Sequence, residues 1–144
     1  MLSQTCQIAI KAAIYLSQQQ GRKGPKVGVL IIAKEINASE HTVGKVLQRL
    51  VKNDIIISQK GPTGGFYMTE EQRKLPIIKI VHAIDGKDTF RKCALGLNNC
   101  SASHPCPIHE DYEKARAEIE KVFKKRRIID LCEKVEEGVC YLMK

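Results

Sequence analysis

The sequence predicts a mainly α-helical fold with a small β-hairpin wing, arranged as a winged helix-turn-helix that is followed by a long C-terminal helix. Two short amphipathic patterns lie next to each other within residues 29–51, and a β-branched segment with a glycine-rich turn follows them. A longer amphipathic pattern covers residues 111–127. A winged helix has this order of elements: helix, turn, helix and hairpin.

Composition and charge indicate the class of partner. The 144 residues suit one domain, or one domain with a dimerisation segment, and a hydrophobic fraction of 43% supports an ordinary core. The net charge is +8, and residues 1–89 hold 13 basic and 7 acidic side chains, a net +6. This excess favours an anionic partner, and nucleic acid is the commonest one for a small protein.

The chain carries six cysteines and no visible targeting or membrane-spanning segment. No apolar run approaches the ~20 residues that a membrane span requires. We therefore expect a cytoplasmic protein without membrane contact. Because thiols are kept reduced in that compartment, the cysteines indicate metal ligands or redox groups before they indicate disulfides.

The first helix is expected over Ser3–Gln20, with Ser3 as its N-cap and Gly21 as its stop. Glycine and proline then mark a turn-rich connection over Gly21–Lys26. A short helix over Val29–Ile36 follows. It is the first helix of the predicted helix-turn-helix.

The second helix of that pair begins after a brief turn at Asn37 and Ala38, and Ser39 is its expected N-cap. Its apolar residues follow the i, i+3, i+4, i+7, i+8 stripe of an amphipathic helix, at Val43, Val46, Leu47, Leu50 and Val51. Two short helices joined by a tight turn indicate a helix-turn-helix, although an ordinary packed pair has the same pattern.

The segment after Asn53-Asp54 predicts the wing. Ile55–Ser58 has the β-branched composition of a strand, Lys60–Gly65 is a turn with three glycines and a proline, and Phe66–Met68 is the returning strand. Glycine permits positive φ and close approach of backbone N–H groups to phosphate. Lys60 places a positive charge at the same point.

Three further segments are expected beyond the wing. A helix begins near Pro76, runs to about Ile84 and is closed by Asp85-Gly86. Phe90–His109 is expected to be irregular, because Gly, Asn, Ser and Pro are frequent there. Ile128–Tyr141 is expected to form a last short helix.

The longest helix is expected from Asp111 to about Arg127. Its apolar residues form a narrow seam at Tyr112, Ala115, Ile119, Val122 and Ile129. Such a seam is typical of half of a coiled coil or of a dimer interface. A helix packed on its own domain is the alternative interpretation.

The wing reads Ser58-Gln59-Lys60-Gly61-Pro62-Thr63-Gly64-Gly65-Phe66. These residues closely resemble the wing motif of the Rrf-two family of bacterial regulators, which includes the iron–sulfur biogenesis regulator and the nitric-oxide-sensing repressor. Ile77–Gly86 resembles the helix that follows the wing in that family, and Ile8–Ala12 resembles the opening of its first helix. The resemblance covers essentially the whole chain.

The resemblance implies a homodimer, joined through the C-terminal dimerisation helix, in which each subunit presents one winged helix to a palindromic operator in double-stranded DNA. Dimers of this type place their two recognition helices about one DNA turn, ~34 Å, apart or a multiple of that. It further implies two parts: a winged-helix DNA-binding domain over residues 1–86, and a cysteine-rich sensor loop with the dimerisation helix over residues 87–144.

Four candidate metal ligands lie in the irregular segment: Cys93, Cys100, Cys106 and His109. Thiolate binds iron strongly, and a loop rich in Gly, Asn and Ser can bend to bring spaced thiolates onto one cluster. Cluster-binding members of the family carry three cysteines here, and the biogenesis regulator has a histidine three residues after the last. The expectation is an iron–sulfur cluster, 2Fe-2S or 4Fe-4S. Structural zinc on the same ligands is the main alternative.

The loop departs from the family pattern at two points. The first cysteine spacing is one residue longer than in the best-known members. In the nitric-oxide sensors an aspartate of the first helix completes the cluster, whereas Gln7, a poor iron ligand, occupies that position here. This difference favours His109 as the fourth ligand. His104 is a nearby competitor, and Cys6 is a candidate to approach the cluster of the partner subunit.

The expected DNA contacts lie at the start of the second helix and at the wing tip. The N-terminal part of the second helix in a helix-turn-helix reads base edges. The polar residues there that avoid the apolar stripe are Ser39, Glu40, His41, Thr42 and Lys45. The wing-tip candidates are Lys60, Gly61, Pro62 and Thr63, and Gln4 and Lys11 are candidates for phosphate contacts. Gly44 costs ~1 kcal/mol relative to alanine, and either permits close approach to DNA or is a tolerated weakness.

We expect a transcriptional regulator and not an enzyme. Gain, loss, oxidation or nitrosylation of its cluster is expected to reposition the loop, and so to change the spacing or tilt of the two winged helices. A cluster-free member that acts by thiol oxidation or partner binding, and a zinc-stabilised regulator, are the alternatives. No glycine fingerprint, metal-hydrolase motif or nucleophile–base pair supports catalysis, and a cluster carrier would not need a wing. Cys132 and Cys140 are expected to be buried small hydrophobic residues.

Overall fold

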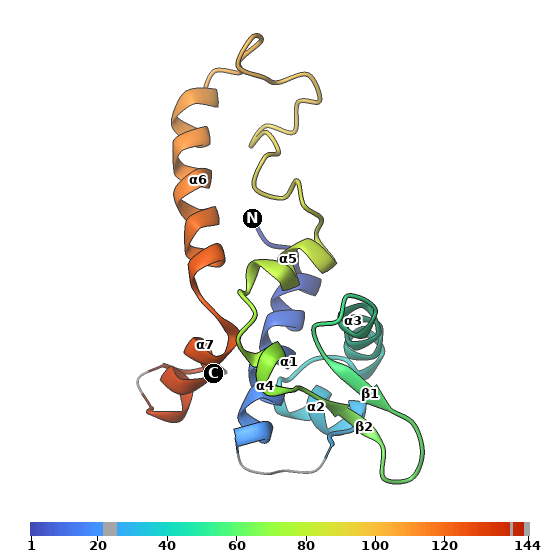
Figure 1. Ribbon diagram of the computed structural model, residues 1–144. Helices are drawn as coiled ribbons and strands as arrows, with labels where there is room; N and C mark the ends of the chain where they lie inside the picture. The colour runs from blue at the N-terminus through green and yellow to red at the C-terminus, as the bar shows by residue number, and fades with distance from the viewer. Residues whose placement is uncertain (22–25, 139, 143–144) are drawn as a thin grey trace.

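The computed structural model describes residues 1–21, 26–138 and 140–142. The expected connection over Gly21–Lys26 therefore lies outside the described residues at positions 22–25. The elements are, in order, α1 (Gln4–Gly21), α2 (Val29–Glu35), α3 (Glu40–Lys52), β1 (Ile57–Gln59), β2 (Gly65–Tyr67), α4 (Glu70–Arg73), α5 (Ile78–Ile84), α6 (His109–Lys125) and α7 (Ile128–Glu136) (Figure 1). The predicted fold class, mainly α with one hairpin, is confirmed.

Helix α1 is the centre of the core. It contacts α3, α5 and α7, which lie around it in Figure 1. Ala9, Ala12 and Ala13 are fully buried, and these small side chains let neighbouring helices approach closely. Ser3 accepts a hydrogen bond at Oγ from the Cys6 amide at 3.0 Å, which confirms it as the N-cap. Both Ser3 N–H and Ser3 Oγ–H donate to the Asp85 carboxylate, so the start of α1 is tied to the end of α5.

Helices α2 and α3 form the predicted helix-turn-helix. Asn37 has a φ of 50°, which lets the chain reverse within the turn between them. Ser39 is the N-cap of α3, because its Oγ accepts a hydrogen bond from the Thr42 amide at 3.2 Å. The predicted stripe faces the core, where four of its five residues are buried: Val43, Val46, Leu47 and Leu50.

The hairpin is shorter at its start than expected. β1 and β2 pair antiparallel with Ser58 opposite Phe66. Ile55 and Ile56 precede β1 and are buried in the core, so the prediction that the strand begins at Ile55 was wrong. The returning strand also ends one residue earlier than predicted. Val27 extends the pairing, since its N–H donates to Phe66 O and its carbonyl accepts from Phe66 N.

One helix was not predicted from the sequence. α4 is a single turn with a capping box between Thr69 and Gln72. It places Arg73 inside the molecule, where the guanidinium donates from Nε to Ser17 Oγ at 3.1 Å. α5 follows close to its predicted bounds, with Pro76 in the turn before it.

Helix α6 lies along one edge of the molecule (Figure 1). All of its residues are described, and none of them is buried. Its bounds agree within two residues with the prediction. The last helix was predicted to reach Tyr141, but α7 ends at Glu136, where Glu137 and Gly138 form its C-terminal turn. Within the described ranges, no helix combines the length and apolar character needed to cross a membrane.

Candidate metal centre and nucleic-acid interface

The irregular loop between α5 and α6 brings the three predicted cysteines together. The sulfur atoms of Cys93, Cys100 and Cys106 all lie within 4.8 Å of one another. The sulfurs of Cys93 and Cys106 are 3.6 Å apart. All three residues are partly exposed. Three thiols that converge in this way form a ready donor set for a soft metal or a cluster.

His109, the first residue of α6, lies beside one of these thiols but is not within 4.8 Å of all three. Its Nδ1 lies 3.0 Å from Cys100 Sγ. Its Nε2 is buried, has no hydrogen-bond partner among the described residues, and lies 3.8 Å from Glu113 Oε2. His104 is exposed, and its Nδ1 lies 3.2 Å from Ser103 Oγ. Of the two histidines proposed as ligands, His109 therefore lies beside the cysteines.

The environment of the thiols differs from residue to residue. The backbone N–H of Leu97, above all, lowers the pKa of Cys93 to about 7, because it stabilises the thiolate. The Cys106 amide acts in the same direction on Cys100. The pKa of Cys100 is nevertheless raised, since burial and the neighbouring thiols of Cys106 and Cys93 outweigh that hydrogen bond. Mutual interaction of this kind is expected where several thiols share one site.

The cysteine loop is joined to α6 by two further contacts. Arg116 Nη1 donates to the carbonyl oxygens of Arg91 and Lys92, at 2.6 and 3.0 Å. The rings of Phe90 and Phe123 lie 5.4 Å apart, centroid to centroid. Because both contacts hold the start of the loop against α6, a displacement of the loop would be transmitted directly to that helix.

The remaining cysteines lie outside the site. Cys6 is fully buried, and burial, with a smaller contribution from the Asp85 carboxylate, raises its pKa to about 12. It lies in the core of its own subunit. Cys132 is buried as predicted. Cys140 is exposed, so the prediction that it is buried was wrong; α7 ends before it, and it has no helix face to turn toward the core.

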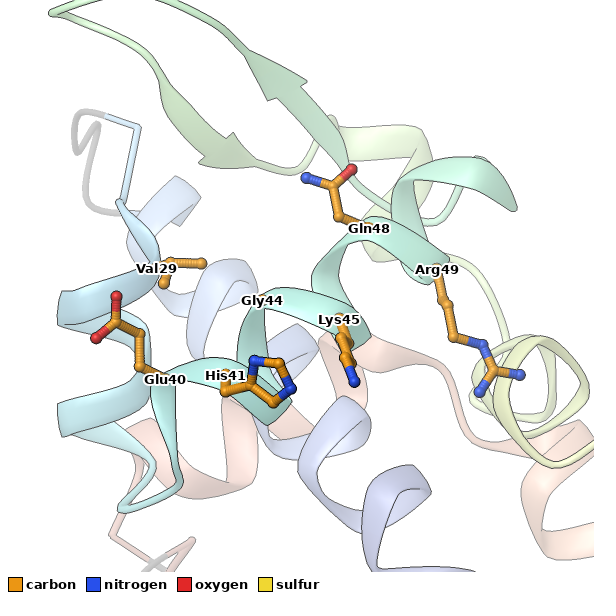
Figure 2. Close-up of a pocket in the computed structure, with 7 residues that line it drawn as sticks. All are labelled: Val29, Glu40, His41, Gly44, Lys45, Gln48 and Arg49. Atoms are coloured by element: carbon orange, nitrogen blue, oxygen red, sulfur yellow. The ribbon is translucent and has the colours of Figure 1, made fainter.

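The exposed face of α3 carries a hollow of about 890 Å³. Three of the predicted DNA contacts line it, namely Glu40, His41 and Lys45 (Figure 2). Gln48 also lines the hollow but was not among the predicted contacts, although it lies eight residues after Glu40, on the same side of the helix. Gly44 and Val29 also line the hollow.

A second hollow, of about 490 Å³, lies between α1 and the start of α3. Gln4 and Lys11 line it from α1, and Ser39 and Thr42 line it from α3. Ser39 Oγ donates to Thr42 Oγ1 at 2.8 Å, so these two side chains also close the first turn of α3. Polar groups and one lysine beside a helix N-terminus suit a backbone phosphate.

Arg49 lines the edge of the first hollow but is turned toward α5 (Figure 2). Its Nη2 donates to Ala83 O at 3.0 Å and to Ile84 O at 2.7 Å. These carbonyls belong to the C-terminal end of α5, where a cation is favoured. Arg49 therefore joins α3 to α5, the helix that leads into the cysteine loop.

The wing tip is exposed at all four predicted positions: Lys60, Gly61, Pro62 and Thr63. Gly61 has a φ of 105°, which a residue with a side chain rarely adopts. Gly64 is required for a different reason, since a Cβ there would lie 2.0 Å from Gln59 O. The wing glycines thus shape the hairpin and leave its tip open to a partner.

The chain matches a family model over most of its length. The Rrf2 model, described as an iron-dependent transcriptional regulator, matches residues 2–134. A protein from Aquifex aeolicus (strain VF5) that is named as an HTH-type transcriptional regulator is 32% identical over 133 residues. The match covers 91% of this chain and 90% of that protein. An rrf2-like regulator by name, from Rhodobacter capsulatus, is 27% identical and covers 85% of this chain and 79% of its own.

Solved structures show the same fold at low identity. CymR (YrzC), the global cysteine regulator of B. subtilis, superposes with a TM-score of 0.74 at 18% identity, over 92% of this chain and 96% of that one. T. potens IscR superposes with a TM-score of 0.74 at 20% identity, over 98% of this chain and 92% of that one.

Proposed function

Because the chain belongs to the Rrf2 (Rrf-two) family of transcriptional regulators, we propose that it binds double-stranded DNA as a homodimer and senses iron–sulfur, redox or nitric-oxide status. The sensor in this proposal is an iron–sulfur cluster held by Cys93, Cys100, Cys106 and His109. The main observation in support is that three sulfurs converge within 4.8 Å of one another, with the His109 ring beside that of Cys100. The proposed setting is the cytoplasm, where thiols remain reduced.

The donor set fits such a group. Thiolates and an imidazole nitrogen ligate iron in proteins, and the His109 nitrogen on the side of the thiols is Nδ1, 3.0 Å from Cys100 Sγ. A bound cluster supplies electron-transfer chemistry and reactivity toward oxidants. The chain's own part is to hold three thiolates and one imidazole in place. The 2Fe-2S and 4Fe-4S forms are both compatible with these ligands.

The proposed DNA contacts are of two kinds, contacts to base edges and contacts to phosphates. Glu40, His41 and Lys45, with Gln48, line the exposed hollow of α3 and suit base edges in the major groove. The phosphate contacts we propose come from the second hollow and from the wing tip, where the exposed Lys60 lies next to Gly61. In this proposal residues 1–86 form the DNA-binding part.

Residues 87–144 supply sensing and dimerisation in the proposal. Ala115 and Val122 are exposed on α6, and the exposed Ile108 lies directly before its first residue; a spacing of seven residues places the three on one line. Ile119, another residue of the predicted seam, packs against the core of its own subunit. We therefore propose that the exposed line, and not the whole predicted seam, meets the partner subunit and presents two winged helices to a palindromic operator.

A cluster-free sensor is the second candidate, and one distance favours it. The Cys93 and Cys106 sulfurs are 3.6 Å apart, so a small movement would allow a disulfide. In this candidate, oxidation of the two thiols takes the place of cluster loss. A zinc ion on the same four ligands is the corresponding structural alternative.

Selection from a random-sequence duplex library tests the DNA-binding proposal. The wild-type protein, cluster-loaded under anaerobic conditions or metal-free, is expected to recover a palindromic duplex and to bind it with different affinity in the two forms. Lys45→Ala and Lys60→Ala should both weaken binding. Lys134→Ala, which removes the same charge from the exposed face of α7, is the matched control and should not.

Three outcomes count against the proposal. Failure to recover any duplex in either form would contradict DNA binding. Equal affinity of the two forms would contradict sensing through the loop. An equal loss in Lys134→Ala would mean that net charge, and not the proposed face, determines binding.

A further inference from the structure

Gly44 is a glycine that the fold does not require. It lies at the fifth of the thirteen residues of α3. Apart from its chain neighbours and the backbone of its own helix, a Cβ at this position would meet no heavy atom within 4 Å among the described residues. Two wing glycines show the opposite case, because a Cβ at Gly64 would lie 2.0 Å from Gln59 O and one at Gly65 would lie 2.9 Å from the Val27 backbone. Within the described subunit, alanine would fit at position 44 without displacing anything.

Glycine at this position weakens the helix that carries it. A glycine in a helix interior loses more backbone entropy on folding than alanine does and leaves the backbone more exposed to water. α3 carries the predicted base contacts, so its rigidity bears directly on recognition. The missing methyl group therefore has a structural disadvantage and, within the described subunit, no structural benefit.

The position of Gly44 indicates where the benefit lies. Glu40 and Gln48 are four residues before and after it, so the three residues form one row along the helix. The neighbouring row carries His41 and Lys45, and all five residues line the same hollow. Figure 2 shows Gly44 as the point of bare backbone between these side chains. At the middle of this exposed face, therefore, no side chain extends beyond the backbone of α3.

We propose that Gly44 is a positioning residue for sequence recognition: it is the point at which α3 comes closest to the floor of the major groove. The inference rests on the proposed DNA binding. A helix with side chains is ~10–12 Å wide and the groove is ~12 Å wide, so the fit leaves little spare room. Bare backbone at position 44 lets α3 enter far enough for His41, Lys45 and Gln48 to reach base edges.

The test is Gly44→Ala in the full-length chain, with a duplex that the wild type has selected from a random library. The substitution should raise the denaturant midpoint of unfolding, because alanine favours the helix. It should at the same time weaken binding to the selected duplex by roughly tenfold or more, about the loss of one base contact. Binding to an unrelated duplex should change much less, because phosphate contacts dominate there.

Ala117→Gly is the matched control. Ala117 is exposed on α6 and lies off the line through Ile108, Ala115 and Val122, so this variant removes a methyl group from a helix without touching either proposed interface. It should lower the midpoint and leave DNA affinity unchanged. The double variant should have nearly the wild-type midpoint and still bind weakly, which separates stability from recognition.

The outcomes are distinct. Tight binding of the selected duplex by Gly44→Ala would overturn this inference and leave the proposed function intact. An equal loss on selected and unrelated duplexes would also overturn it, because the effect would then not concern base recognition. If the wild type selects no duplex, the proposed function itself is wrong and the inference falls with it.

Discussion

Arg73 is a charged side chain held almost entirely inside the molecule, with a residue exposure of 9%. Its Nε donates to the fully buried Ser17 Oγ, and its Nη1 lies 2.8 Å from Glu70 Oε1. Arg73→Ala would leave Ser17 without this partner and open a cavity between α4 and α1. We expect the free energy of unfolding to fall by ~2–4 kcal/mol, measured by chemical denaturation.

Lys74→Ala is the matched control for this prediction. Lys74 makes an ion pair of the same spacing with Glu71, at 3.3 Å, but both side chains are exposed. Its removal should change stability by no more than ~0.5 kcal/mol. Equal effects of the two substitutions would contradict the view that burial makes the Arg73 contacts valuable.

The cysteines outside the loop should differ sharply in reactivity. Burial raises the pKa of Cys6 to about 12, so at pH 8 it is a thiol that solvent does not reach, and Cys132 is buried as well. Cys140 is exposed. Iodoacetamide at pH 8 should therefore modify Cys140 in the folded protein and reach Cys6 and Cys132 only in denaturant, as followed by mass spectrometry of tryptic peptides. Rapid modification of Cys6 in the folded state would contradict the packing described here.

At the scale of elements, the join between α3 and α5 depends on Arg49. One nitrogen of its guanidinium donates to two carbonyls at the end of α5. Arg49→Met should lower the free energy of unfolding by ~1–2 kcal/mol, because two partly exposed hydrogen bonds to a charged group are lost. Arg49→Lys keeps the charge but not the planar group, and should recover only part of the loss. Full recovery of the free energy of unfolding in Arg49→Lys would contradict this prediction, because charge alone would then explain the contact between the two helices.

Element boundaries were predictable where a local signal sets them. Ser3 and Ser39 were identified as N-caps because the capping hydrogen bond spans only three residues. The start of β1 was not predictable in the same way. Ile55 and Ile56 have a strand-like composition, yet they are buried in the core, where tertiary packing determines their conformation. α4 was missed because it is one turn long, although the Thr69 and Gln72 spacing of its capping box was visible.

The convergence of the three loop cysteines was predictable from the sequence, but the geometry of the site was not. The spacing of Cys93, Cys100 and Cys106 in a loop indicated that they share a site, and the structure brings their sulfurs within 4.8 Å. The place of His109 depends on where α6 begins, and a sequence pattern locates a helix start only to within a few residues. The contacts of Arg49 and Arg116 to distant carbonyls had no sequence signal, because they join segments far apart in the chain.

At the scale of the whole molecule, the dimer proposal predicts a specific effect of Val122→Glu. Val122 is 54% exposed on α6 and lies in the apolar line proposed to meet the partner. A buried, unpaired carboxylate would disfavour association, so the variant should sediment as a monomer with unchanged helix content by circular dichroism. Ala117→Glu, on another side of α6, should remain dimeric. A dimeric Val122→Glu variant would place the interface elsewhere.

The iron–sulfur cluster that we propose for the cysteine loop is tested most directly by chemical analysis of anaerobically purified protein. Iron, acid-labile sulfide and zinc should be measured together with the visible spectrum, in the wild type and in Cys100→Ser. The wild type should contain iron and sulfide in equal amounts and show broad visible absorption, and both should be strongly reduced in the variant. A colourless wild-type protein that contains one zinc ion, or no metal, would contradict the claim.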